Sequence, residues 1–401
     1  MMLKLTRTPG CSLADRVRIP NQPGTPAKGR DGMRALVPVL CLPLAFALPA
    51  AAGEEGRALP AVKEFVYHNP ASFQDPGNTG ELRDPAIIRV GDAYYLVFTV
   101  FPFTHHTDRD PSKPDWNSSP GIKLYRSTDL VRWEFVDWLV KSSELPEDCP
   151  YKHRFWAPEL RRMNGKFHLT FTANNWIKEE HNPHGAFGMY AFVGVAERVE
   201  GPYEHITCID GAGCDTSLFC DDDGRTYAYI PAMDVHVQEV DLARLHEGKA
   251  QLIGERKRVV TARNDDIGLD WSYKYLEGPW AFKRGDTYCL IFAGLRKDGH
   301  DGQSFDPGGG FEYWSGIAYA KSPMGPFAKD PRGKAFHGGH MVTFEGPDHR
   351  QWFSYRWEMD DSIRGRLCID PLDFDQHGRY IPSTPSKGMV RIRYQEGSRH
   401  P

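Results

Sequence analysis

The sequence predicts an all-β protein, a five-bladed β-propeller with four-stranded antiparallel blades. After residue 80, an apolar run, a Gly-containing turn and a second run rich in Tyr, Phe and Leu follow one another five times. Each of these hairpins precedes a further pair of candidate strands, and no long amphipathic helical stretch competes with them. Five copies of four short strands are typical of a propeller, whose blades pack radially. A β-sandwich is the alternative, but it gives no reason for a repeating four-strand unit.

The five hairpins set the order of the blades. The first runs from Ala86–Val90 through the turn Gly91-Asp92 into Tyr94–Thr99. A turn with Gly between β-branched and aromatic runs is a hairpin signal. The later turns are Asn164-Gly165, Asp223-Gly224, Gly285-Asp286 and the region around Gly346-Pro347. The candidate strand pairs that complete the blades are Ile122–Phe135, Met189–Tyr203, Val235–Asp241, Gly316–Phe327 and Arg366–Phe374.

The residue just before each first strand is expected at the central channel. The first strand of every propeller blade lines this channel, so five blade starts that are distant in sequence meet at one end of the axis. The long loops 101–120, 174–188 and 295–311 return to the same end. Three of the five starts are carboxylates. The five residues are Asp84, Ala157, Asp215, Glu277 and His340.

Composition and chemistry together favour a carbohydrate partner. Lys and Arg number 49 against 53 Asp and Glu, so the chain lacks the basic surplus of a nucleic-acid-binding protein. Aromatic residues make up 12% of the chain, and their flat rings suit both sugar stacking and a β core. Cleavage of a glycosidic bond with inversion needs a carboxylic acid and a carboxylate base with different pKa values. A third carboxylate beside the acid raises its pKa by like-charge repulsion.

Five phrases at blade spacing, and a sixth that follows the fifth, resemble glycoside hydrolase family 43 over roughly residues 65–385. Each phrase alone is a weak signal, but their order along the chain is specific. The phrases are Arg83-Asp84-Pro85, Phe155-Trp156-Ala157-Pro158-Glu159-Leu160, Asp215-Thr216-Ser217-Leu218-Phe219, Glu277-Gly278-Pro279-Trp280, Gly338-Gly339-His340 and Arg366-Leu367 with Ile369-Asp370-Pro371-Leu372.

The resemblance implies a role for each candidate site residue. Asp84 would be the general base, Asp215 the modulator that raises the pKa of the acid and positions it, and Glu277 the general acid. Arg366 would reach into the substrate pocket. The resemblance implies that no cofactor is required, although some members hold a structural calcium ion near the residue that matches His340, often through waters. Cys214 and the long loop 101–120 depart from the family pattern.

Each site residue also has an ordinary structural explanation. Asp84 before a Pro is a common turn pair, Asp215 could cap a turn, and Glu277 could lie in a surface loop. We expect Trp156, Trp176 and Phe103 to contact the substrate, with packing at strand ends as the alternative for the two Trp residues.

The leading functional hypothesis is a secreted, inverting glycoside hydrolase that acts from chain ends on arabinofuranosyl or xylosyl linkages of plant-type saccharides. A hydrolase of galactosyl or other glycosides is the first alternative. A non-catalytic carbohydrate-binding propeller is the alternative from another class, and it would be natural if one carboxylate were missing.

The N-terminal region predicts secretion or export to a periplasm. Met33-Arg34 opens an apolar run that extends to Leu48 and ends in Ala50-Ala51-Ala52, as a signal peptide does. Residues 1–52 are therefore predicted to be a leader and signal outside the fold, 61–390 the propeller and 391–401 a tail. The apolar run is too short for a membrane span. An oxidising compartment would permit a local disulfide among Cys208, Cys214 and Cys220.

Overall fold

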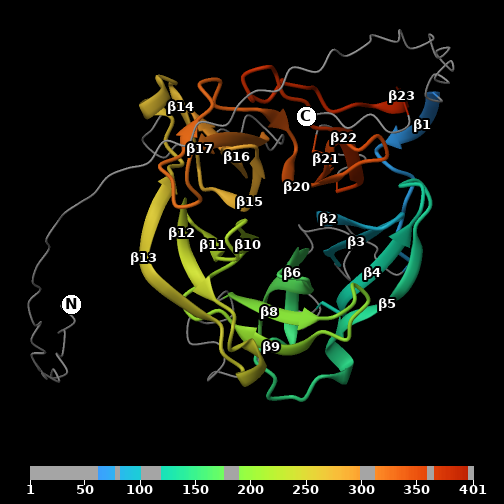
Figure 1. The fold of residues 1–401 in the computed structure, drawn as a ribbon, viewed down its shortest axis with the longest axis vertical. Helices are drawn as coiled ribbons and strands as arrows, with labels where there is room; N and C mark the ends of the chain where they lie inside the picture. The colour runs from blue at the N-terminus through green and yellow to red at the C-terminus, as the bar shows by residue number, and fades with distance from the viewer. Residues whose placement is uncertain are drawn as a thin grey trace, which may run out of the picture. The chain divides into compact units, whose positions relative to one another are not determined.

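The computed structural model describes residues 62–76, 82–100, 119–175, 189–298, 312–358 and 365–395. These residues form five antiparallel sheets arranged around a common axis, as Figure 1 shows, and one further two-stranded ribbon. The predicted five-bladed β-propeller is confirmed. No helix in the described ranges has the length and apolar character needed to cross a membrane.

Blades 1 to 3 have the predicted four antiparallel strands. Blade 1 contains β2 (Arg83–Val90), β3 (Ala93–Thr99), β4 (Gly121–Ser127) and β5 (Glu134–Lys141). Blade 2 contains β6 (His153–Met163), β7 (Lys166–Asn174), β8 (Tyr190–Ala196) and β9 (Glu204–Cys208). Blade 3 contains β10 (Ser217–Cys220), β11 (Thr226–Ala232), β12 (Asp234–Asp241) and β13 (Gln251–Val260).

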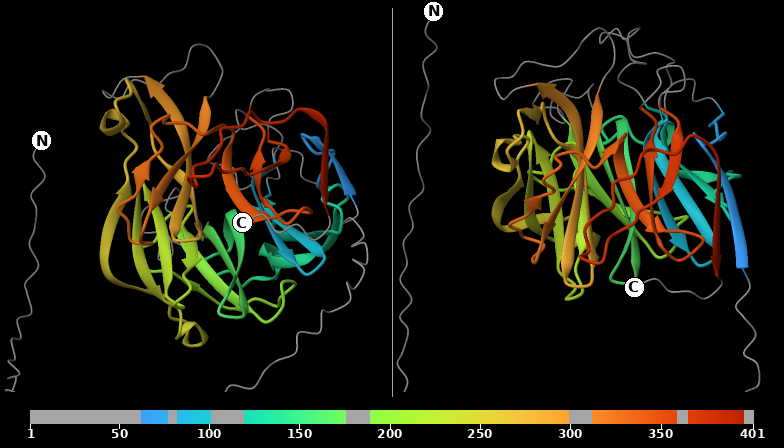
Figure 2. Two further views of the ribbon diagram at one scale, coloured as in Figure 1. Left: turned by 45° about the horizontal axis from the view of Figure 1, so that its top comes forward. Right: turned by 90° about the horizontal axis from the view of Figure 1, so that it is seen from above.

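Blades 4 and 5 depart from the four-strand unit. Blade 4 has β15 (Glu277–Arg284), β16 (Thr287–Asp298) and β17 (Tyr313–Ala320), with the short strands β14 (Trp271–Tyr273), β18 (Ala328–Lys329) and β19 (Phe336–His337) at its edges. Blade 5 has only β20 (Gly339–Glu345), β21 (Gln351–Arg356) and β22 (Leu367–Pro371). The ribbon of β1 (Val62–Asn69) and β23 (Gly388–Gln395) lies beside this blade, next to β22 in Figure 1, and its strands are the blue and red ones at the right of the right-hand view in Figure 2.

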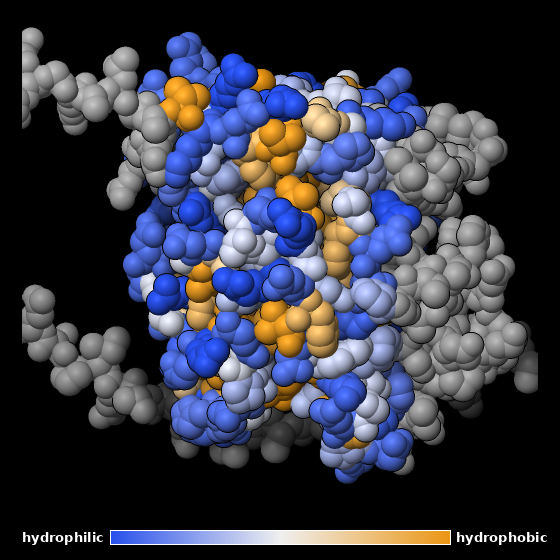
Figure 3. Space-filling model, turned by 90° about the vertical axis from the view of Figure 1, so that its right-hand side faces the viewer, coloured by the Kyte–Doolittle hydropathy of each residue, from blue (hydrophilic) through white to orange (hydrophobic). Residues whose placement is uncertain are grey.

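The blades are held together by apolar side chains on both faces of their middle strands. Every residue of β3 is buried, and β7 is buried at all positions after Lys166. A strand covered on both faces loses the alternation of polar and apolar residues, which explains the nearly continuous apolar sequence of β3. Strand β7 instead buries the polar residues His168, Thr170 and Thr172 between its apolar ones. On the side of the molecule that carries β1, polar side chains separate the exposed apolar ones into narrow patches (Figure 3).

One backbone feature recurs at the start of all five blades. A residue with left-handed φ, between 44° and 57°, interrupts or precedes the first strand, and in four blades a shift in the ladder register accompanies it. Such a bulge turns the chain so that a side chain is re-aimed. The five residues are Asp84, Ala157, Asp215, Gly278 and His340. In blade 4 the equivalent position is Gly278, one residue after the Glu277 that the sequence pattern placed there.

Candidate active site

The bulges gather the predicted carboxylates at one end of the axis. Asp84 Oδ1 lies 3.1 Å from His340 Nδ1. The His340 ring packs against the backbone of Gly278, where an added Cβ would lie 2.9 Å from Nδ1, and Gly278 follows Glu277 directly. The negative charges of the three carboxylates act on one another, with Asp84 raising the pKa of Asp215 and Asp215 raising that of Glu277. Residues from blades 1, 3, 4 and 5 therefore form one site.

Asp84 is surrounded by groups that favour its ionised form. Burial alone would raise the pKa of this carboxyl, but the charge and hydrogen bond of His340 outweigh it, with help from Arg356 and Thr99. The Thr99 hydroxyl donates to Asp84 Oδ2 at 2.5 Å. The result is a pKa held well below the usual range for Asp, so this group is a carboxylate at neutral pH.

Glu277 has the opposite electrostatic environment. Burial and then the negative charge of Asp215 raise its pKa to about 7, against the lowering influence of Arg356, Tyr313 and His340. The Tyr313 hydroxyl donates to Glu277 Oε1. Near neutral pH, a substantial fraction of Glu277 therefore carries a proton while Asp84 carries none.

The pKa of Asp215 is raised above the usual value for Asp. Burial raises its pKa first and the charge of Asp84 adds to this, whereas His340 lowers it. Its backbone N–H donates to Thr172 Oγ1 at 2.9 Å, and the Cys214 thiol donates to its Oδ1 at 3.1 Å. Cys214, one of the two departures from the family pattern, thus contacts a site carboxylate directly.

The surroundings of His340 do not fit a directly coordinated metal ion. Burial lowers the pKa of His340, but the charge and hydrogen bond of Asp84 raise it to about 9, so Nδ1 carries a proton that it donates to Asp84. The described residues contain no group of three or more His, Cys, Asp or Glu side chains that could hold a metal.

Sequence analysis did not identify Arg356, Tyr313 and Thr99 as residues of this site. Arg356 carries a positive charge that acts on Asp84, Asp215 and Glu277, and it forms an ion pair with buried Glu358. Its guanidinium lies 4.6 Å from the centre of the Tyr313 ring. These residues follow no shared motif in the sequence, but Arg356 ends the second strand of its blade directly before a loop, a position where functional residues are common.

The four predicted substrate-binding residues fall into two groups. Trp156, half-buried on β6 just before the left-handed Ala157, pairs with Thr172 across the blade. Arg366 precedes β22, and its guanidinium donates to the Gln74 side-chain oxygen at 2.6 and 3.1 Å when the Gln74 amide is oriented to accept. Trp176 and Phe103 lie outside the described residues.

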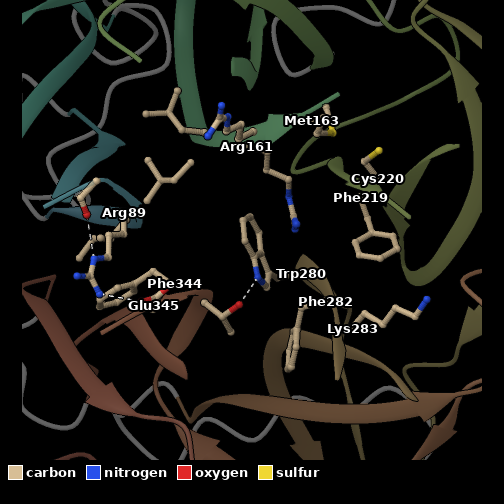
Figure 4. Close-up of a pocket in the computed structure, with 16 residues that line it drawn as sticks. Arg89, Arg161, Met163, Phe219, Cys220, Trp280, Phe282, Lys283, Phe344 and Glu345 are labelled. Atoms are coloured by element: carbon tan, nitrogen blue, oxygen red, sulfur yellow. Dashed lines mark hydrogen bonds and ion pairs between the residues drawn. The ribbon is translucent and has the colours of Figure 1, made fainter. Parts of the chain in front are cut away.

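Two further charged residues, Glu159 and Arg161, lie on β6 beyond the left-handed Ala157. Glu159 is buried, accepts a hydrogen bond from Ser217 Oγ at 2.7 Å, and has a pKa raised to about 7 by burial. Arg161 follows on the same strand and lies 3.3 Å above the centre of the Trp280 ring. Figure 4 shows Arg161 and Trp280 in a cavity of about 540 Å³ at the turn end of the blades, away from the catalytic candidates.

All six cysteines of the described ranges, Cys208, Cys214 and Cys220 among them, are unpaired thiols in this structure. The local disulfide that the sequence would permit is therefore not formed here.

Comparison with known proteins connects this geometry to a family. The model of the family described as "Glycosyl hydrolases family 43" matches residues 73–379. The chain is 28% identical over 295 residues to "Xylosidase/arabinosidase 43B" of Humicola insolens, covering 67% of this chain and 46% of that protein. It is 25% identical over 333 residues to "Beta-D-galactofuranosidase xynD" of Aspergillus niger, covering 77% of this chain and 84% of that protein.

A solved structure supports the same fold. The crystal structure of a thermostable family-43 glycoside hydrolase superimposes with a TM-score of 0.57 at 20% identity, covering 84% of this chain and 97% of that one. Of the first three curated relatives, the matched region spans only 38% to 55% of their own length. The chain thus corresponds to about half of these longer proteins.

Proposed function

Because the chain belongs to glycosyl hydrolases family 43, we propose that it is a glycoside hydrolase that cleaves O-glycosidic bonds with inversion at the anomeric carbon. The observation that carries the proposal is the opposite protonation of two carboxyl groups in one site. Asp84 is held ionised, and Glu277 has a pKa raised to about 7. Pairs of titratable groups whose pKa values are pushed apart identify the base and the acid of such a reaction.

In the proposed reaction, Asp84 accepts a proton from a water molecule as the water oxygen attacks the anomeric carbon. Glu277 donates its proton to the glycosidic oxygen as the bond from that oxygen to the anomeric carbon breaks. The sugar leaves with inverted configuration, and proton exchange with solvent restores both carboxyl groups. Asp215 keeps Glu277 protonated through its negative charge, and the Arg356 guanidinium offsets part of the negative charge of the site.

As substrate we propose terminal arabinofuranosyl or xylosyl groups of plant-type oligosaccharides or polysaccharides. The printed name of the Humicola insolens relative supports this choice. Hydrolysis of galactosyl groups is the second candidate, because the Aspergillus niger relative is named a galactofuranosidase and aligns over most of its own length. Arg366 and Trp156 are the proposed substrate contacts within the described residues, with Trp176 and Phe103 proposed from sequence alone.

The proposal extends to the cellular location and to calcium. We propose that the protein is secreted or exported to a periplasm, because segment 33–52 resembles a signal peptide. Because the described residues around His340 supply too few ligands for direct coordination, a calcium ion there would be held through waters and would have no chemical role. Activity that survives chelation with EDTA, measured against untreated enzyme, supports this view of calcium.

A substrate panel with product analysis tests the proposed function. The enzyme is expected to release 4-nitrophenol from an α-L-arabinofuranoside or a β-D-xyloside, with a β-D-galactofuranoside as the competing substrate. Proton NMR during the first minutes should show the inverted anomer before mutarotation. A retained anomer contradicts the mechanism, and binding of saccharides without turnover of any of them favours the non-catalytic alternative.

A further inference from the structure

In blades 1, 2 and 5, a side chain near the end of the second strand interacts with the next blade around the ring. Thr99 lies opposite Arg83 in the ladder of blade 1, Thr172 opposite Trp156 in blade 2, and Arg356 opposite Gly339 in blade 5. Each of these partners comes directly before the left-handed residue of its own blade. The three side chains therefore occupy equivalent positions near the end of the second strand.

Each of the three acts on the left-handed residue of the following blade. The backbone N–H of Ala157 donates to Thr99 Oγ1 at 2.7 Å, and the backbone N–H of Asp215 donates to Thr172 Oγ1 at 2.9 Å. In the same sense around the ring, the charge of Arg356 lowers the pKa of Asp84. A side chain at this position thus interacts, by a hydrogen bond or by its charge, with the left-handed residue of the next blade.

Thr99 differs from Thr172 because it also contacts the carboxylate of its own blade. Its hydroxyl has one proton to donate and two lone pairs to accept with. The Ala157 N–H can only donate, so the hydroxyl accepts there and directs its single proton to Asp84 Oδ2, at 2.5 Å. An ionised carboxylate is the best acceptor for that proton.

We propose that Thr99 is a positioning residue for Asp84, an inference that rests on the proposed function. Thr99 is only 1% exposed, so its contacts are shielded from competing water. His340 holds Oδ1 and Thr99 holds Oδ2, which fixes the plane of the carboxylate. Each oxygen keeps a lone pair with which Asp84 can accept a proton from water. Fixed geometry of this kind lowers the barrier of the chemical step more than it strengthens substrate binding.

The chain offers matched variants to test the inference. Thr99→Val removes the hydroxyl at nearly constant shape, and Thr99→Ser restores it. Thr170→Val is the control, because Thr170 is a buried threonine on β7, two residues before Thr172, and makes no side-chain hydrogen bond within the described residues. The readouts are kcat and KM on whichever glycoside the wild type cleaves best, with melting temperature measured for every variant.

The expected result separates the chemical step from binding. For Thr99→Val we expect kcat to fall about 10- to 100-fold with KM changed by less than about threefold, since a hydrogen bond to a charged group is lost. Thr99→Ser and Thr170→Val should keep kcat within about threefold of the wild type. Wild-type kcat in Thr99→Val, or an equal loss in Thr99→Ser, overturns the inference.

Two further outcomes are decisive. If Thr99→Val fails to fold, the comparison passes to Thr99→Ala, whose kcat must again fall while that of Thr99→Ser does not. A wild type inactive on every glycoside of the panel overturns the proposed function and this inference together. An active wild type with unaffected Thr99 variants overturns only the inference.

Discussion

At the scale of single residues, the site depends on unequal environments for identical functional groups. Asp84 and Glu277 both carry carboxyl groups, yet a protonated histidine faces the first, whereas the second is subject to the negative charge of Asp215. Sequence spacing predicted that these carboxylates meet at one end of the axis, because blade starts converge in any propeller. It could not select Arg356, Tyr313 or Thr99, whose contacts depend on strand register and on packing between blades.

The dependence of rate on pH follows from these pKa shifts. The general acid must be protonated, so kcat/KM should fall as the pH rises through about 7, the raised pKa of Glu277. The base must be ionised, and the pKa of Asp84 lies well below its usual range, so activity should persist on the acid side to below about pH 4.

Asp215→Asn removes the charge that raises the pKa of Glu277. The basic limb of the pH–rate profile should therefore move to lower pH by about one unit.

A pH–rate profile of wild type and Asp215→Asn checks both statements. Asn has nearly the shape of Asp, so the variant changes charge with little change in packing. A basic limb that stays at the same pH in Asp215→Asn contradicts the assignment of Asp215 as modulator.

The role of Glu277 predicts a contrast between leaving groups. Glu277→Gln cannot donate a proton, so cleavage of natural linkages, whose alkoxide leaving groups are poor, should fall on the order of 10²–10⁴-fold. Release of 2,4-dinitrophenolate needs little protonation and should fall far less. The measurement compares kcat/KM for a disaccharide and for the matching dinitrophenyl glycoside. Equal losses on both substrates contradict the assignment of Glu277 as general acid.

At the scale of strands, a left-handed residue at the start of each first strand positions the side chains of the site. The hairpin turns after these strands were predictable, because Gly between apolar runs marks them. The bulges were not predictable, since four of the five left-handed residues are Asp, Ala or His rather than Gly. The backbone strain of a left-handed non-Gly residue is commonly found where function requires a re-aimed side chain.

Gly278 is the one glycine among the five left-handed residues, and a Cβ added there would contact the ring of His340. Gly278→Ala should destabilise the protein through both its φ of 53° and the contact of the new Cβ with the His340 ring. The matched control is Gly91→Ala, which has a φ of 60° and no atom within 4 Å of the added Cβ. Left-handed backbone costs Ala roughly 1–2 kcal/mol at either site. Only Gly278→Ala adds the contact.

Urea unfolding measures this difference. Gly278→Ala should lose at least about 1 kcal/mol more stability than Gly91→Ala, and its kcat should fall because His340 is displaced from Asp84. Equal stability losses in the two variants, with unchanged activity in Gly278→Ala, contradict the close packing of His340 on this bulge.

At the scale of the whole molecule, the ring is closed where blade 5 meets blade 1. Ser354 Oγ donates to the Pro85 carbonyl at 2.6 Å, directly beside Asp84, so ring closure and site geometry share residues. The β1–β23 ribbon supports this junction, because Asn69 and Tyr67 on β1 donate to Ile369 and Asp370 on β22. Repetition in the sequence predicted five blades, but it could not predict that the last blade has three strands. The ribbon that stands beside it joins segments from opposite ends of the chain.

The ribbon predicts how closure contributes to stability. Along β23, exposed and half-buried residues alternate, and Ile392 packs against the apolar cluster that contains residues of blades 1 and 5. Ile392→Asn places a polar amide in that cluster and should lower the free energy of unfolding by about 2–4 kcal/mol. Met389→Asn is the matched control, because Met389 lies on the same strand with 65% of its surface exposed. This substitution should change stability by less than about 0.5 kcal/mol.

Urea unfolding followed by Trp fluorescence measures both variants. The ribbon supports the junction of blades 5 and 1, and Asp84 lies beside that junction. Residual activity should therefore disappear at a lower urea concentration in Ile392→Asn than in Met389→Asn. Equal unfolding midpoints for the two variants would show that the ribbon lies on the propeller without holding the ring closed.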